Sequence, residues 1–199
     1  MDISWNERYN QKEYVYGELP NLFFADQLNK LAVGSIVLPC EGEGRNAVFA
    51  ASKGWLVKAF DISIVGKTKA TELANKHNVI LDYTIAEALT KNYTENSVDV
   101  VAFIYAHFSA MDRERIHQKS IQWLKVGGRV VLEAFNTEQQ KNNSGGPKDL
   151  SMLYTQEMIK EDFKDLNIEL ISTLEVNLQE GKYHRGKSNI IRFVGIKNR

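Results

Sequence analysis

A short acidic turn containing two glycines follows the first strongly apolar run of the chain. Gly42 and Gly44 stand in this turn beside Glu41, directly after residues 35–38. Glycines let a backbone bend and approach a ligand closely, and the free N–H groups that open the next helix supply donors and a partial positive charge. Asp61 ends the next apolar run, where a carboxylate can accept both hydroxyls of a ribose. A glycine turn after one strand, followed by an acidic residue at the end of the next strand, predicts a cofactor that carries a nucleoside.

The same turn also satisfies the pattern of a different cofactor. Gly42, Gly44 and Ala47 match the G-x-G-x-x-G/A spacing of dinucleotide-binding proteins, so an NAD-binding oxidoreductase stays open as an alternative. Glu41 and Glu43 would then lie beside a doubly charged pyrophosphate. Their negative charges would repel it, whereas the start of a helix should attract it. S-adenosylmethionine carries an ammonium, a sulfonium and a ribose diol but no phosphate. The acidic turn therefore favours S-adenosylmethionine.

Strands and helices alternate around these residues and must position them. Apolar runs and helical spacing predict strands at 35–38, 55–60, 79–83, 98–105 and 129–135, and helices at 46–53, 63–77 and 111–124. This alternation is typical of βαβ units with right-handed crossovers. We expect an α/β fold of the doubly wound, Rossmann-like type, with a mostly parallel sheet and helices on both faces.

The pattern changes after residue 135. A polar loop at 136–149 and a helix at 155–165 precede two strand-like segments, 168–178 and 189–197, which are joined by a turn at 179–188. Strands joined by so short a turn must pair antiparallel, so a β-hairpin should complete a seven-stranded sheet. We expect one domain over 1–199, with a cap or lid at 1–33, a cofactor-binding core at 34–135 and an acceptor side at 136–199.

The composition excludes several classes of protein. Of 199 residues 43% are apolar, and 25 basic side chains balance 25 acidic ones, so no strong field attracts nucleic acid or an anionic membrane. Cys40 cannot form an internal disulfide, and there is no signal region or run of about 20 apolar residues. Four scattered histidines and one cysteine lack the spacing of metal ligands. We expect a cytoplasmic monomer or homodimer without a metal.

Several motifs resemble one known family. The chain is similar to the class I S-adenosylmethionine-dependent methyltransferases, and within them to the tellurite-resistance (TehB-like) and thiopurine-methyltransferase-like small-molecule enzymes. The resemblance spans nearly the whole chain and rests on Glu7-Arg8-Tyr9, Tyr14-Val15-Tyr16-Gly17, Pro20-Asn21, residues 41–47, residues 145–150, and Gly181, His184, Gly186 and Arg192. One departure is that Leu38, Pro39 and Cys40 stand where the family has D/E-x-G; Glu41 or a backbone carbonyl is expected to replace the missing acid.

The resemblance assigns roles at the cofactor. It implies S-adenosylmethionine bound by the turn and by the ends of the next strands. Gly42 and Gly44 would line the methionine part, and Asp61 would hold the ribose. The complete implied cofactor set is Glu41, Gly42, Gly44, Arg45, Asp61, Ile62, Ser63, Glu87, Ala88 and His107, in which Ile62 and Ser63 flank the adenine, Glu87 and Ala88 approach its amino group, and His107 forms the wall toward the acceptor.

The resemblance also points to residues on the acceptor side. His184, Arg185 and Arg192 would position a small, anionic or soft nucleophile such as a thiol or a selenium or tellurium oxyanion. Alternative roles are a salt bridge or edge-strand position for Arg192, an exposed turn for His184 and a hydrogen-bonded strand end for His107. A non-catalytic module that binds S-adenosylmethionine, and an RNA methyltransferase, stay open as alternative functions.

Overall fold

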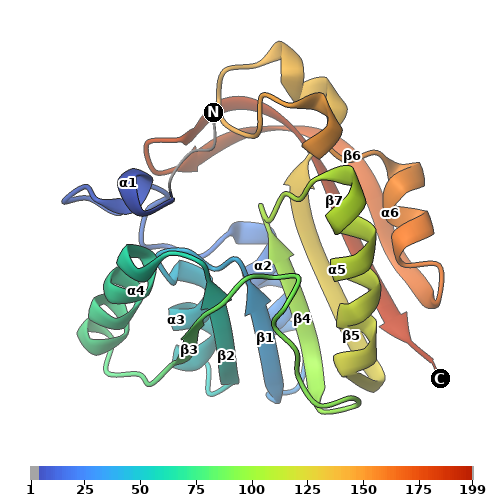
Figure 1. Cartoon of the computed structure of the whole chain (residues 1–199), viewed down its shortest axis with the longest axis horizontal. Helices are drawn as coiled ribbons and strands as arrows, with labels where there is room; N and C mark the ends of the chain where they lie inside the picture. Colours follow the sequence, from blue (N-terminus) through green and yellow to red (C-terminus); the bar gives the residue numbers. More distant parts are fainter. Residues whose placement is uncertain (1–4, 199) are drawn as a thin grey trace.

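A single mixed sheet organises the chain. The computed structural model describes residues 5–198 and contains seven strands in the order β3-β2-β1-β4-β5-β7-β6 (Figure 1). The first five strands along the chain pair in parallel, and β7 pairs antiparallel with both β5 and β6. The strands are β1 (Ser35–Pro39), β2 (Leu56–Asp61), β3 (Asp82–Ile85), β4 (Val98–Ile104), β5 (Leu124–Phe135), β6 (Leu166–Glu180) and β7 (His184–Lys197).

Helices cover both faces of this sheet. The helices are α1 (Trp5–Tyr9), α2 (Leu22–Asn29), α3 (Arg45–Ser52), α4 (Ile64–Lys76), α5 (Ala110–Trp123) and α6 (Gln156–Asp162), with 3-10 turns η1 (Thr137–Lys141) and η2 (Leu150–Met152). Apolar residues of α5 and α6 pack with one face of the sheet, and those of α2, α3 and α4 with the other (Figure 1). The predicted fold class is confirmed.

The continuous apolar run of β4 follows from this arrangement. Val101 and Phe103 belong to the core beneath α5 and α6, whereas Val100 and Ala102 belong to the core beneath α2 and α3. A central parallel strand is buried on both faces and therefore needs apolar residues at successive positions. The carboxyl ends of β1, β2 and β4 lie at one edge of the sheet, where the predicted cofactor residues follow them.

Several element boundaries differ from the sequence prediction; β5, for example, begins at Leu124 instead of residue 129. The third strand begins at Asp82 instead of residue 79, because the N–H of Val79 still donates to the carbonyl of Ala74 at the end of α4. The expected turn at 179–188 is confined to 181–183, and the β6–β7 pairing continues to Glu180 and His184. Gly181 has a φ of +72°, which permits so tight a reversal. His184 and Arg185 therefore lie in β7 and not in a turn.

Candidate cofactor and acceptor site

The glycine turn joins β1 to α3, and a glutamate of the turn itself caps the start of α3. Gly44 has a φ of +88° and begins the helix without a side-chain cap. Glu41 Oε1 instead accepts hydrogen bonds from the N–H groups of Asn46 at 2.9 Å and Ala47 at 2.7 Å. Burial raises the pKa of Glu41 to about 7, although these bonds and Arg45 oppose the rise. Because a carboxyl group already occupies the positive end of α3, a pyrophosphate would find its donors taken.

Asp61 lies at the end of β2, facing this turn. Its side chain is 6% exposed; Oδ2 accepts from the N–H of Gly42 at 3.0 Å and Oδ1 from the N–H of Ser63 at 2.9 Å. Burial raises the pKa of Asp61, while these backbone hydrogen bonds lower it. A carboxylate offers about four lone-pair positions, so each oxygen keeps capacity for another donor. The pair of oxygens is suited to the two hydroxyls of a ribose.

The segments predicted to flank the adenine lie beside Asp61. Ser63 is buried and caps α4, because its hydroxyl accepts from the N–H of Gly66, whereas Ile62 is 52% exposed. The N–H of Ala86 donates to the carbonyl of Asp61, which brings the residues after β3 next to the end of β2. Glu87 is exposed there and Ala88 half-buried.

Tyr9, which belongs to the expected cap or lid at 1–33, lies over the turn. A Cβ added to Gly42 would lie 2.5 Å from Tyr9 Oη, so the phenol closely approaches the glycine backbone. Tyr9 is 4% exposed, and burial together with Asp61 raises its pKa well above the ordinary value. The ring stacks on Trp5 one helical turn earlier, at 5.4 Å. That helical spacing of two aromatic residues was the signal in the sequence.

A buried ion pair fastens the N-terminal segment to the turn. Glu43 is 4% exposed and pairs with Lys69 of α4. Glu43 Oε2 also accepts from the N–H of Val15 at 2.8 Å. Lys69 Nζ donates to three carbonyls of the same segment, those of Tyr9, Gln11 and Glu13. Glu43 therefore holds residues 9–16 in place.

His107 is fixed at the end of β4 by both ring nitrogens. Its Nδ1 lies 2.7 Å from the carbonyl oxygen of Met152, and its Nε2 accepts from the N–H of Phe135 at 3.2 Å. Burial lowers the pKa of His107 to about 4, so the ring is neutral near pH 7. The ring of Tyr154 contacts it at 4.9 Å. His107 therefore has the hydrogen bonds of a histidine at a strand end, which was the alternative expectation for it.

The hairpin brings an arginine and a glutamate together on the acceptor side. Arg192 Nε of β7 lies 2.7 Å from Glu133 Oε2 of β5. Glu133 is 1% exposed, and its Oε1 also accepts from Asn21 at 2.6 Å and from the hydroxyl of Tyr105 at 2.8 Å. Arg192 therefore has the salt bridge that was the alternative expectation for it.

His184 lies in a pocket of rings beside a second buried pair. It is 6% exposed, and its ring lies 4.3 Å from that of Tyr105 and 4.5 Å from that of Tyr16. Its Nδ1 has no hydrogen-bond partner and lies 3.7 Å from Glu180 Oε2. Burial lowers the pKa of His184 to about 4, against the effect of Glu180. Glu180 is paired with Arg45 at 2.7 Å, so the charge of the Arg45 guanidinium is neutralised by a residue of the hairpin.

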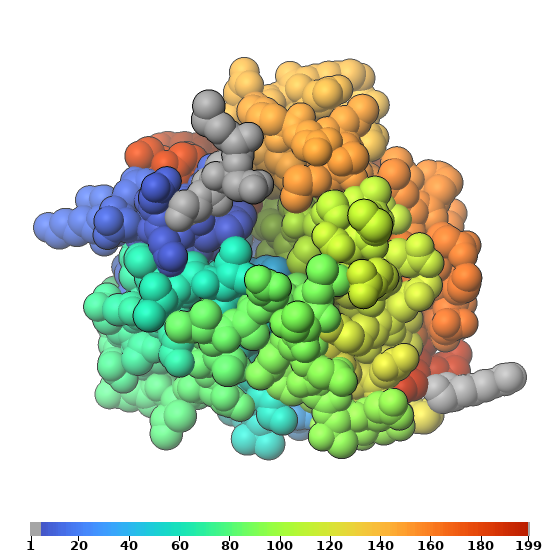
Figure 2. Space-filling model, viewed as in Figure 1, coloured from blue at the N-terminus to red at the C-terminus, as the bar shows by residue number. Residues whose placement is uncertain are grey.

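The molecule has a recess in its surface near several of the segments described above. Figure 2 shows the surface hollowed where the blue N-terminal segment, the orange segment before α6 and the green residues after β4 meet. The structure gathers Asp61, the glycine turn and Tyr9 in one cluster and Tyr105 and His184 in a second.

Comparison with known proteins identifies the core of the chain. Residues 39–132 match the family model described as a methyltransferase domain. The matched segment, just under half of the chain, is similar to methyltransferase domains. This likeness supports the predicted methyltransferase and its predicted cofactor, S-adenosylmethionine.

Relatives and solved structures agree with the methyltransferase domain. The chain is 28% identical over 114 residues to Phosphoethanolamine N-methyltransferase 1 of Triticum aestivum, a match that covers 56% of this chain and 23% of that protein. The structure is similar to TehB from Haemophilus influenzae (TM-score 0.72, 17% identity, 97% of this chain and 65% of that one). It is also similar to a SAM-dependent methyltransferase from Methanosarcina mazei (TM-score 0.64, 16% identity, covering 85% of this chain and 95% of that one). At these identities the structures show the fold alone, and the chain spans under a quarter of the curated relative.

The matched domain covers only half of the candidate site. It includes the glycine turn, Asp61 and His107, whereas Glu133, His184 and Arg192 follow it. Arg185 is exposed and lines a separate recess with Lys182 and Gln11, so it does not join His184.

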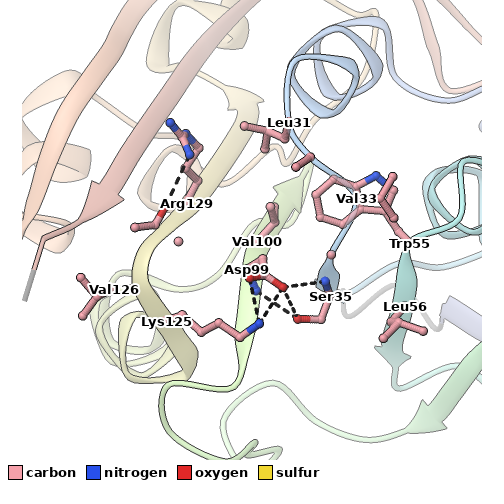
Figure 3. Close-up of a pocket in the computed structure, with 14 residues that line it drawn as sticks. Leu31, Val33, Ser35, Trp55, Leu56, Asp99, Val100, Lys125, Val126 and Arg129 are labelled. Carbon is pink, nitrogen blue, oxygen red and sulfur yellow. Dashed lines mark hydrogen bonds and ion pairs between the residues drawn. The ribbon is translucent and has the colours of Figure 1, made fainter.

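The opposite edge of the sheet carries a different recess. An open cavity of about 530 Å³ lies at the amino ends of the strands, where Asp99 accepts from Ser35 and pairs with Lys125 (Figure 3). None of the predicted site residues lines it. Within residues 5–198 no group of side chains could hold a metal ion, and no helix is long and apolar enough to cross a membrane.

Proposed function

We propose that this chain transfers a methyl group from S-adenosylmethionine to a small-molecule acceptor held between the glycine turn and the β6–β7 hairpin. The observation that carries the proposal is the pairing of Asp61 with a turn whose helix end is already occupied by Glu41. This arrangement suits a ribose diol without a neighbouring phosphate. The proposal describes a single domain of three parts, cap or lid, cofactor core and acceptor side.

The residues around the turn fit the cofactor. When bound, S-adenosylmethionine supplies an electrophilic methyl group on a sulfonium. Asp61 would accept the ribose hydroxyls, and Tyr9 with the backbone of Gly42 and Gly44 would border the methionine part. The adenine would lie among the residues that follow β2 and β3, which are Ile62, Ser63, Glu87 and Ala88.

On the acceptor side, the chain's task is alignment and exclusion of water. Transfer to an aligned nucleophile needs little proton chemistry, so positioning supplies much of the rate. His107 is held by two hydrogen bonds, and the N-terminal segment is held over the turn by Lys69 and Glu43. His184 is neutral near pH 7, and its Nδ1 faces the carboxylate of Glu180 at 3.7 Å, so the hydrogen of the ring belongs on Nδ1 and Nε2 can accept a hydrogen bond from the methyl acceptor.

The acceptor's identity is the finer part of the proposal. The TehB-like resemblance suggests a thiol or a selenium or tellurium oxyanion, and the name of the wheat relative suggests an amine. Membership of the TehB-like group, cytoplasmic location and the absence of a nucleic-acid partner belong to the same proposal and rest on composition and resemblance.

Binding of the cofactor tests the first half. We expect titration calorimetry to detect binding of S-adenosylmethionine and S-adenosylhomocysteine and no binding of NAD. Asp61→Asn should weaken S-adenosylmethionine by roughly 10- to 100-fold, because charge-assisted hydrogen bonds are worth about 1.5–3 kcal/mol. Asp26→Asn, which changes an exposed carboxylate paired with Lys30, is the control and should bind normally. Binding of NAD alone, or an unchanged dissociation constant in Asp61→Asn, would refute the assignment.

Turnover tests the second half. The chain should methylate at least one member of a panel of amines, thiols and selenium and tellurium oxyanions, measured with methyl-labelled S-adenosylmethionine. Binding of cofactor without any methylated product would favour the non-catalytic binding module instead.

A further inference from the structure

The loop between β3 and β4 carries the residues expected to approach the adenine. The N–H of Ala86 donates to the carbonyl of Asp61 at 3.0 Å, so the loop begins directly beside the end of β2. Ala88 is half-buried and packs with the core beneath α5, whereas Glu87 and Leu89 are exposed. This part of the loop forms one short turn and no helix or strand, so contacts with other elements must fix its shape.

Helix α5 supplies two side chains that hold this loop. Lys119 Nζ donates to the carbonyl of Ala88 at 2.8 Å and to that of Leu89 at 2.7 Å. Trp123 Nε1, one turn later on the helix, donates to Asn92 Oδ1 at 2.7 Å. The ammonium of Lys119 also lies over the ring of Trp123, 5.7 Å from its centroid. The loop is therefore fastened to α5 at two points.

The charge of Lys119 is used on backbone carbonyls. The side chain is half-buried, and within residues 5–198 its ammonium has no carboxylate partner. Burial and the nearby charge of Arg115 lower the pKa of Lys119, so the charged form is held at some cost. An apolar side chain of the same length would pack its stem against α5 without that cost. The two carbonyls are therefore what the ammonium serves.

Fixing a carbonyl also fixes the N–H group of the next residue. Both belong to one planar trans peptide unit and point in opposite directions. Because the carbonyl of Ala88 points at Lys119, the N–H of Leu89 points away from it, and no group in the described part of the chain accepts this N–H. The exposed carboxylate of Glu87 lies two residues away. The loop thus offers a donor and an acceptor, which match the ring nitrogen and the amino group on one edge of adenine.

From these contacts we infer that Lys119 is a positioning residue that sets the preference of the site for adenine. The inference rests on the proposed function, in which the adenine lies beside Glu87 and Ala88. Lys119 acts through the loop and does not touch the cofactor. Hypoxanthine has a carbonyl in place of the amino group and a hydrogen on the neighbouring ring nitrogen, so it would meet the same loop with donor and acceptor exchanged. A loop held in this shape therefore rejects hypoxanthine.

Binding of two ligands that differ only in the base tests the inference without turnover. The probes are S-adenosylhomocysteine and S-inosylhomocysteine, measured by titration calorimetry. The wild type should bind the adenosyl ligand about ten-fold or more tightly than the inosyl ligand. Lys119→Met should weaken S-adenosylhomocysteine about five-fold or more and S-inosylhomocysteine less than about two-fold, because the loop is no longer held in one shape. Equal weakening of both ligands, or no change in either, would overturn the inference, since a merely structural lysine acts on both alike.

Further variants separate positioning from folding. Lys119→Arg keeps a charged donor beside the carbonyls and should retain most of the preference for the adenosyl ligand. Glu87→Ala should reduce that preference in the wild type but have little effect in Lys119→Met, because a loop that is not held cannot aim residue 87. The same reduction in both backgrounds would contradict the role of Lys119. If Lys119→Met does not fold, Lys119→Gln takes its place in both comparisons.

The control removes a lysine at the other edge of the sheet. Lys125→Met breaks a partly exposed pair with Asp99 and should leave both dissociation constants unchanged. If the wild type binds S-adenosylhomocysteine without preference over S-inosylhomocysteine, this inference fails and the proposed function stands. If neither ligand binds the wild type, the proposed function fails and the inference falls with it.

Discussion

Residue 44 shows how little space the cofactor turn leaves. Gly44 has a φ of +88°, and an added Cβ would lie 2.5 Å from the Cβ of Ala70 and 2.9 Å from its Cα. Gly127 has a similar φ of +81°, but a Cβ there would meet nothing within 4 Å. Gly44→Ala therefore destabilises the fold through both backbone strain and overpacking, whereas Gly127→Ala destabilises it through backbone strain alone.

The two glycine variants form a matched test. We expect Gly127→Ala to lower the free energy of unfolding by about 1 kcal/mol and Gly44→Ala by about 3 kcal/mol, measured by urea unfolding. Gly44→Ala should also weaken S-adenosylmethionine binding, because α4 must move away from the turn. Equal losses in the two variants would mean that packing against Ala70 contributes nothing.

Residue roles were predictable where one short segment carries them. Gly42, Gly44 and Asp61 follow from strand ends and turn composition alone, and the structure brings them together. Lys69 was not assigned, and Tyr9 was placed only within the cap or lid, because their roles arise from contacts between distant segments, as in the bond from Lys69 to the carbonyl of Tyr9, sixty positions away. No local pattern records which distant backbone a lysine will meet.

At the scale of elements, α4 and the N-terminal segment behave as one unit. Lys69 is the link, since it pairs with Glu43 and donates to three carbonyls of residues 9–13. Removing one member of a buried ion pair leaves the other charge uncompensated, which costs roughly 3–5 kcal/mol. Removing both members avoids that penalty.

Three variants measure this link. We expect Lys69→Met to lower the free energy of unfolding by roughly 3–5 kcal/mol and to speed amide exchange at residues 9–16. The double variant K69M/E43Q should recover part of the stability. Lys76→Met, which removes an exposed pair with Glu18, should change stability by less than about 1 kcal/mol. Unchanged exchange at residues 9–16 in Lys69→Met would contradict the proposed fastening.

Element boundaries were predictable where burial dictates composition. The apolar run of β4 was recognised because it is buried on both faces. The outer hairpin was harder, since β6 alternates exposed and half-buried positions and carries polar residues such as Gln179 up to the turn. Those residues suggested a loop, but pairing with β7 extends the strand through Glu180. As a result His184 was expected in a turn and lies in a strand.

For the whole molecule, the sum of its buried titrating groups sets the response to pH. Burial lowers the pKa of His184 to about 4, below the value of about 6.5 in an unfolded chain. Burial raises the pKa of Glu41 to about 7, above its unfolded value. Between the folded and unfolded pKa values of each group, the two states of the protein bind different numbers of protons. At residue 184 the unfolded chain binds more protons than the folded chain, and at residue 41 the folded chain binds more than the unfolded chain. The two groups therefore act in opposite directions as the pH falls.

Variants at these two positions should separate the opposing contributions. Between pH 7.5 and pH 5, protonation of residue 184 in the unfolded chain costs the wild type about 2 kcal/mol that His184→Asn does not lose. Protonation of the folded carboxyl gives the wild type about 2 kcal/mol that Glu41→Gln does not gain. Urea unfolding at both pH values measures each difference, and His77→Gln, at an exposed histidine, should follow the wild type. If His184→Asn and Glu41→Gln shift the pH dependence in the same direction, one of the two groups is not buried in solution as the structure has it.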